Sequence, residues 1–167
     1  KWKDFIVYSH PDFIVLNKPC GIPSHPSVDN IIENSLTQTQ IALNSKLYIC
    51  HRLDTTTVGL IIYGRNSEFV KKFNLQLQNK TMVKKYIAVV ENNQTSPIKP
   101  QRLIHYMEPS PRAPKKVSPI FHEKWDECEL MIENIYAPQS DQLKNLYSVV
   151  KINLITGRTH QIRAQLS

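Results

Sequence analysis

Residues 51–62 read His51-Arg52-Leu53-Asp54-Thr55-Thr56-Thr57-Val58-Gly59-Leu60-Ile61-Ile62. The segment places a carboxylate two residues after a guanidinium and then enters an apolar run, which predicts a strand that begins after a bend at Gly59. An aspartate before threonines is often a turn or cap residue, but the threonines here could fill that role themselves. A carboxylate beside a guanidinium stays ionised, and an ionised carboxylate can act as a nucleophile or a base. Asp54 is therefore a candidate catalytic residue.

A second segment, Thr156-Gly157-Arg158-Thr159-His160-Gln161-Ile162-Arg163, lies about a hundred residues further along. Its glycine permits a tight turn, and a helix that starts after such a turn offers backbone N–H groups to an anion. The segment could simply be a solvated basic helix end. The functional interpretation is that one arginine of this segment binds phosphate and another pairs with Asp54, the candidates being Arg158 and Arg163.

A third segment, Lys84-Lys85-Tyr86-Ile87-Ala88-Val89, is rich in residues that favour strands. Strand alternation puts Tyr86 and Ala88 on one face. Tyr86 alone would be an ordinary sheet aromatic. A tyrosine ring next to two lysines also suits the stacking of a nucleobase, so Lys84 and Lys85 are candidate RNA-binding residues.

The composition agrees with an acidic partner. The 167 residues carry a net charge of +7 and have a pI near 9.3, which suits nucleic acid but also a merely basic protein. No apolar run reaches the ~18 residues of a membrane helix, and the N-terminus has no signal-peptide pattern. The three cysteines are isolated, which disfavours disulfides and a zinc site and favours an intracellular location. Cytoplasm, mitochondrion and plastid fit equally.

The pattern along the chain predicts an α+β fold with a mixed, mainly antiparallel sheet and flanking helices. Residues 97–119 hold six of the eleven prolines and are predicted to resist both helix and central strand. Ser67 is the expected cap of one helix and Thr159 of another. The expected strands cover residues 13–16, 60–63, 86–90, 130–136 and 147–155, and the expected helices cover residues 31–43 and 67–79, with a last one after Thr159.

These segments resemble the RluA-type pseudouridine synthases, which isomerise uridine to pseudouridine in RNA. The family signature His-Arg-Leu-Asp-x-x-Thr-Ser-Gly-Leu matches residues 51–60 except at Val58, where serine is usual. Its Lys-x-Tyr-x-Ala pattern matches residues 84–88, and its Thr-Gly-Arg-Thr-His-Gln-Leu/Ile-Arg motif matches residues 156–163. An early Asn-Lys-Pro-x-Gly element matches residues 17–21. Gln165 stands where the family commonly has histidine.

The resemblance implies a fold, a reaction and roles for individual residues. Residues 1–167 are expected to form one pseudouridine synthase catalytic domain, incomplete at its C-terminus, that is monomeric and binds structured ribosomal or transfer RNA. No cofactor and no metal are implied. Asp54 is expected to initiate the isomerisation, Tyr86 to stack on the target base, Arg163 to pair with Asp54, and Arg52 to enter the space that the flipped uridine leaves.

Two other functions remain open from the sequence. A non-catalytic RNA-binding or ribosome-assembly protein with the same fold would also be basic and carry exposed aromatics, although such a binder has no need of Asp54. A hydrolase that uses Asp54 on another glycosidic bond would normally need a second carboxylate in a comparable motif.

Overall fold

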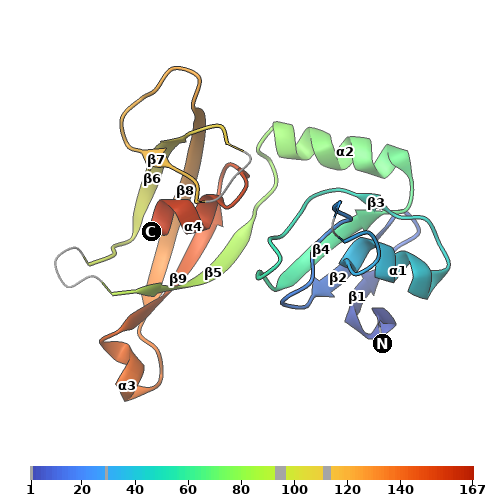
Figure 1. Ribbon diagram of the computed structural model, residues 1–167, viewed down its shortest axis with the longest axis horizontal. Helices are drawn as coiled ribbons and strands as arrows, with labels where there is room; N and C mark the ends of the chain where they lie inside the picture. The colour runs from blue at the N-terminus through green and yellow to red at the C-terminus, as the bar shows by residue number, and fades with distance from the viewer. Residues whose placement is uncertain (1, 29, 93–96, 111–113) are drawn as a thin grey trace. The chain divides into compact units, whose positions relative to one another are not determined.

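The computed structural model describes residues 2–28, 30–92, 97–110 and 114–167. These residues form two compact units, Lys1–Thr81 and Met82–Ser167. The described part of the first unit contains a four-stranded sheet, and that of the second a five-stranded sheet (Figure 1). All pairings between the named strands are antiparallel. The predicted α+β class with mainly antiparallel pairing is confirmed, with two sheets where one was expected.

The sheet of the first unit has the strand order β1-β2-β4-β3. Its two central strands, β2 (Phe13–Lys18) and β4 (Gly59–Gly64), are the predicted ones and pair from Phe13↔Gly64 to Lys18↔Gly59. The remaining elements are a 3-10 helix at Trp2–Phe5, β1 (Ile6–Ser9), α1 (Ser35–Leu43), β3 (Tyr48–Ile49) and α2 (Ser67–Gln78).

The core of this unit lies between the sheet and α1. Alternate residues of β2 and β4 are fully buried, and Leu36 and Leu43 of α1 pack against them. The helix begins later than predicted, because buried Asn34 caps it by accepting a hydrogen bond from the Thr37 amide at 2.9 Å. The buried members of this cluster are Ile14, Leu16, Leu47, Ile61 and Tyr63.

Helix α2 packs through aromatic rings. Phe69 stacks on Phe13 with ring centroids 4.7 Å apart, and Phe73 stacks on His51 at 5.6 Å. The prediction that Ser67 caps this helix is wrong. Asn66 is the cap, and its side-chain oxygen accepts from the Phe69 amide at 2.8 Å, so the helix start is fixed one residue earlier.

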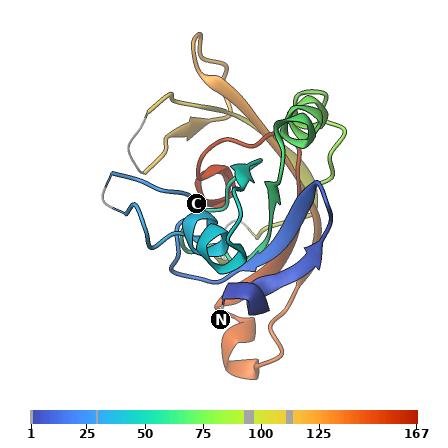
Figure 2. The ribbon, with the colours of Figure 1, turned by 90° about the vertical axis from the view of Figure 1, so that its right-hand side faces the viewer.

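The second unit has the strand order β5-β9-β8-β6-β7. Three of its strands, β5 (Lys85–Glu91), β8 (Asp126–Tyr136) and β9 (Tyr147–Leu154), cover the predicted ones. Helix α4 (Gln161–Leu166) packs Ile162 and Leu166 on the sheet core, and the short helix α3 (Asp141–Lys144) lies at the far tip of the β8–β9 hairpin in both views (Figures 1 and 2). The core residues are Leu130, Ile132, Val150, Ile152 and Leu154.

The prediction that residues 97–119 hold no central strand is wrong. Strand β6 (Gln101–Met107) pairs with β8 on one side and with β7 (Val117–Ser118) on the other. The prolines of this region flank residues 101–107 and none lies within them, so every ladder N–H of β6 is kept. Residues 111–113 of the same region lie outside the described residues.

Among the described residues, no helix combines the length and the hydropathy of a membrane-spanning segment.

Gly64 at the end of β4 provides a test of the first unit's packing. A Cβ at this position would lie 2.8 Å from Cγ2 of Val70, and the β-branched valine has little freedom to turn away. We expect Gly64→Ala to lower the free energy of unfolding by about 1–3 kcal/mol, measured by urea denaturation. The Val70→Ala background removes the clashing methyl group and should reduce this cost. An equal cost in both backgrounds would contradict the steric explanation.

Candidate active site

Asp54 lies half-buried in the loop between β3 and β4. Its carbonyl accepts a hydrogen bond from the Thr57 amide at 3.0 Å, which closes a turn. The motif is anchored on its N-terminal side by His51, whose Nε2 accepts from the Ile62 amide at 3.0 Å. Arg52 is exposed, so this loop presents a guanidinium to solvent and keeps the aspartate closer to the protein.

The early Asn-Lys-Pro-x-Gly element packs directly against this loop. Lys18 is fully buried, and its ammonium donates to the carbonyl oxygens of Pro19, Ile22 and Thr55 at 2.9, 2.8 and 3.2 Å. The Gly21 amide also donates to Thr55 O at 2.9 Å. Two motifs more than thirty residues apart are therefore joined through the residue that follows Asp54.

Lys18 also contributes to the electrostatics of the loop. Burial lowers the pKa of the Lys18 ammonium, and the negative charge of nearby Asp54 opposes part of this decrease. Sequence reasoning singled out Arg52 as the cation near Asp54 and missed Lys18. The signal was the position of Lys18 in the Asn-Lys-Pro-x-Gly element, but the contact itself cannot be read from the sequence.

Two further motifs meet in the second unit. The Lys84 ammonium donates to Thr156 O at 3.1 Å and to Ile155 O at 3.4 Å, and the Leu154 amide donates to Lys84 O at 2.8 Å. Gly157 does not have the positive φ that a left-handed turn would need. A Cβ there would lie 3.4 Å from the Lys84 Nζ, so the glycine leaves room for the lysine.

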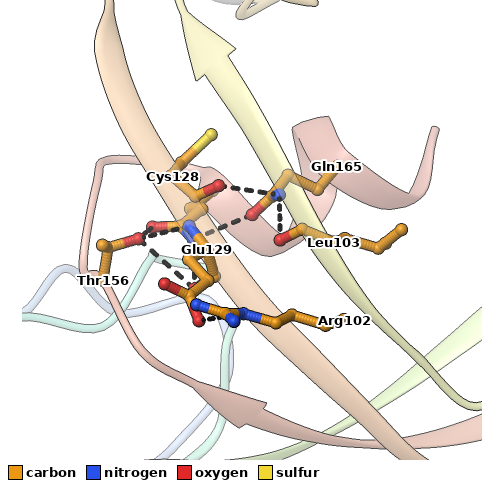
Figure 3. A network of polar contacts seen from close by, with 7 residues as sticks. Arg102, Leu103, Cys128, Glu129, Thr156 and Gln165 are labelled. Atoms are coloured by element: carbon orange, nitrogen blue, oxygen red, sulfur yellow. Dashed lines mark hydrogen bonds and ion pairs between the residues drawn. The ribbon is translucent and has the colours of Figure 1, made fainter. Parts of the chain in front are cut away.

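A buried polar network holds the Thr156–Arg163 segment on β8 (Figure 3). The Thr156 hydroxyl accepts from the Glu129 amide and donates to Gln161 Oε1, both at 2.8 Å, and Gln161 Nε2 donates to Glu129 O at 3.1 Å. The Glu129 carboxylate pairs with Arg102 Nε at 2.7 Å. Because Glu129 and Gln161 are buried, their polar groups need these partners.

The predicted helix start after Gly157 differs from the observed one. Thr159 is not the cap; His160 precedes α4 in a left-handed conformation with φ of 58° and makes no side-chain cap hydrogen bond. The Arg158 amide donates to Gln161 Oε1 at 3.0 Å, so a side chain of the helix already occupies this N–H. Binding of an anion by the other backbone N–H groups of this helix start stays a prediction.

The candidate RNA-binding side chains have different surroundings. Arg158 is exposed but pairs with Asp126 at 3.1 Å, and Lys85 pairs with Glu133. Exposed ion pairs of this kind are weak, so both side chains can exchange partners with phosphate. Lys84 instead donates to backbone carbonyls of its own unit. It therefore has a structural contact in addition to its predicted role in RNA binding.

The predicted catalytic residues fall in both units. Asp54 belongs to the first, while Tyr86 and Arg163 belong to the second. Tyr86 is half-buried on β5 opposite Ile152 and packs on the sheet core, and Arg163 is exposed on α4. The pairing of Arg163 with Asp54 stays a prediction.

Gln165, one of the two departures from the family pattern, makes several hydrogen bonds on α4. Its Oε1 accepts from Gln161 Nε2 at 2.8 Å, and its Nε2 donates to Cys128 O at 3.2 Å and lies 3.0 Å from His105 Nδ1. Burial lowers the pKa of His105, and the neutral ring can accept at Nδ1. Gln165 thus extends the network from β8 to β6 (Figure 3).

The contact between Gln165 Nε2 and His105 Nδ1 makes the stability of the second unit depend on pH. Because the pKa of His105 is lower in the folded protein than its usual 6.5, the folded state binds a proton less readily than the unfolded state. Its contribution to stability is complete above pH 6.5 and is lost progressively as the pH falls from that value toward the lower pKa of the folded state. We expect the urea midpoint to fall less between pH 7.5 and 5.5 in His105→Asn, which keeps an acceptor but cannot be protonated. The same decrease in both proteins would contradict a contribution from His105.

The sequence is similar to those of known proteins. A model of the RNA pseudouridylate synthase family matches residues 12–167. RNA pseudouridine synthase 6, chloroplastic, from Arabidopsis thaliana is 31% identical over 183 residues, covering 99% of this chain and 38% of the relative, and its Oryza sativa counterpart is 29% identical with the same coverage. The Saccharomyces cerevisiae tRNA pseudouridine(31) synthase is 26% identical, covering 97% of this chain and 43% of the relative.

A solved structure supports the fold. Human RNA Pseudouridylate Synthase Domain Containing 4 superposes with a TM-score of 0.70 at 20% identity, covering 99% of this chain and 66% of that one. The chain spans 38–43% of the length of the three curated relatives named above. Since the family model covers nearly the whole chain and four motifs occur in order, the chain belongs to the RNA pseudouridylate synthase family.

Proposed function

We propose that this protein isomerises uridine to pseudouridine in RNA, with Asp54 as the residue that initiates the reaction. The observation that carries the proposal is the assembly of the Asp54 loop on the Asn-Lys-Pro-x-Gly element through Thr55 O, in a chain of this family. A protein that only bound RNA would have no use for an anion held in this way, since a carboxylate repels phosphate.

The reaction breaks the bond between ribose C1′ and uracil N1 and forms a bond between C1′ and C5. The C5 proton leaves and N1 gains a proton, so no electrons and no external group are transferred. Asp54 acts either as a nucleophile at C1′ or as a base on a sugar proton. Either role requires the ionised carboxylate.

The other roles follow from the family resemblance and from the surroundings of each side chain. We assign Tyr86 to stacking on the target base, Arg163 to the catalytic aspartate, and exposed Arg52 to the gap left by the flipped nucleotide, where it offsets part of the few kcal/mol that flipping costs. Burial and the charge of Arg52 lower the pKa of the nearby His25 ring.

The proposed partner is structured RNA, ribosomal or transfer, bound by a monomer. The net charge of +7 favours phosphate contacts, so the affinity should fall steeply with salt. One relative is named for transfer RNA and two for the chloroplast. These names describe those proteins, and transfer RNA is a first substrate to test for this one.

The test is release of tritium from RNA labelled at uridine C5. The full-length protein is incubated with ribosomal and transfer RNA transcripts, and binding is measured in parallel. Release that requires the protein supports the proposal. Tight binding of both RNAs without release would favour the non-catalytic function.

Tyr86→Phe separates two contributions of the tyrosine. The variant keeps the ring for stacking and for its packing on the β-sheet core but loses the hydroxyl. If that hydroxyl helps remove the C5 proton, we expect kcat to fall on the order of 10²-fold with little change in RNA affinity. Unchanged kcat would restrict Tyr86 to stacking. Tyr147→Phe, on the neighbouring strand β9, is the matched control.

A further inference from the structure

Ser24 makes two hydrogen bonds to the residue that precedes Asp54. Its Oγ accepts from the Leu53 amide at 3.0 Å and donates to the Leu53 carbonyl at 2.6 Å. The side chain is only 3% exposed. A buried hydroxyl that satisfies both backbone groups of one residue fixes that residue much as a strand partner would.

Ser24 is itself held by a buried hydrogen-bond network that includes Tyr63 and Ser35. Its carbonyl accepts from the Tyr63 hydroxyl at 2.8 Å, and that hydroxyl lies 2.7 Å from Ser35 Oγ. Tyr63 in β4 and Ser35 at the start of α1 are both fully buried. Burial raises the pKa of Tyr63 to about 12, so its hydroxyl keeps the proton that it donates.

The backbone that follows Asp54 is held by other residues. Thr55 O accepts from the Gly21 amide and the Lys18 ammonium, and Thr56 O accepts from Cys20 Sγ at 3.3 Å. The backbone of Asp54 is therefore anchored through Leu53 before it and through Thr55 after it. Loss of either anchor would allow the carboxylate to move, and displacement of a reacting group by about 1 Å can cost on the order of 10²-fold in rate.

We propose that Ser24 is a positioning residue for Asp54. The proposal rests on the function proposed above, because it assigns Ser24 to the same site. Ser24 acts through the Leu53 backbone and sets the direction of the carboxylate, so its removal should lower kcat and leave the binding of RNA unchanged.

The experiment compares Ser24→Ala with Thr39→Val in the full-length protein. Thr39 is an equally buried hydroxyl of the same unit that donates to Ser35 O within α1, so its variant reports the general cost of a lost buried hydrogen bond. We expect kcat for tritium release to fall about 10- to 100-fold in Ser24→Ala, with KM within about two-fold, and to stay near wild type in Thr39→Val. Equal effects in the two variants, or unchanged kcat in Ser24→Ala, would overturn the proposal.

Two additional measurements make the result specific. Ser24→Thr keeps the hydroxyl and should recover most of the rate, whereas a rate as low as that of Ser24→Ala would argue against the hydroxyl. Amide hydrogen exchange should quicken at residues 53–57 in Ser24→Ala and not in Thr39→Val. Hydrogen exchange can be measured even if the protein has no activity, so the two proposals fail separately. An inactive wild-type protein would overturn the proposed function. Unchanged exchange at residues 53–57 in Ser24→Ala would overturn the role of Ser24 in holding the Leu53 backbone.

Discussion

Asp54→Asn is expected to abolish turnover and to leave RNA binding nearly intact. The substitution keeps the size of the side chain but replaces the carboxylate with an amide, which is neither a nucleophile nor a base at neutral pH. We expect tritium release to slow by at least about 10³-fold, as for the loss of other essential catalytic groups. Affinity for RNA, measured by filter binding, should change by less than about three-fold, because phosphate contacts dominate it.

A matched control separates chemistry from charge. Glu68→Gln neutralises an exposed carboxylate on α2 of the same unit and changes the net charge by the same amount. Its turnover should equal that of the wild type. Near-normal release by Asp54→Asn would remove Asp54 from the reaction, and equal losses in the two variants would trace the effect to net charge.

The elements that the sequence predicted well are those in which local pattern and packing agree. The run Phe13–Leu16, the run after Gly59 and the spacing of the apolar residues in α2 each lead to an observed element. The failures have two physical causes. Asn66 and Asn34 act as caps because of where their side chains point, and β6 forms because its flanking prolines leave the strand itself untouched.

The motifs led to the prediction that Asp54 is catalytic, but they did not reveal how its loop is held. The contacts that hold the loop come from Lys18 and Ser24, which are about 30 or more residues away in sequence. A serine in a proline-rich loop carries no pattern that reveals such a contact. The proximity of Gly157 to the Lys84 ammonium was likewise not predictable, because it becomes visible only once the two segments lie side by side.

Lys18→Met is expected to have the largest effect on stability. The methionine fills a similar volume but leaves three carbonyl oxygens without the ammonium that now binds them. Breaking a buried charged contact in this way costs about 2–4 kcal/mol, even though burial disfavours the charged ammonium and lowers its pKa. We expect the free energy of unfolding, measured by urea denaturation, to fall by that amount, and kcat to fall as well, since Thr55 loses a partner next to Asp54.

The control for this variant is Lys71→Met on the exposed face of α2. Surface changes of this kind alter stability by less than about 0.5 kcal/mol, so the comparison isolates burial from the loss of one positive charge. Amide exchange should quicken around residues 18–22 and 53–57 in Lys18→Met alone. Equal stability of the two variants would mean that the three carbonyls find other partners, and Lys18 would then not be the residue that joins the two loops around Asp54.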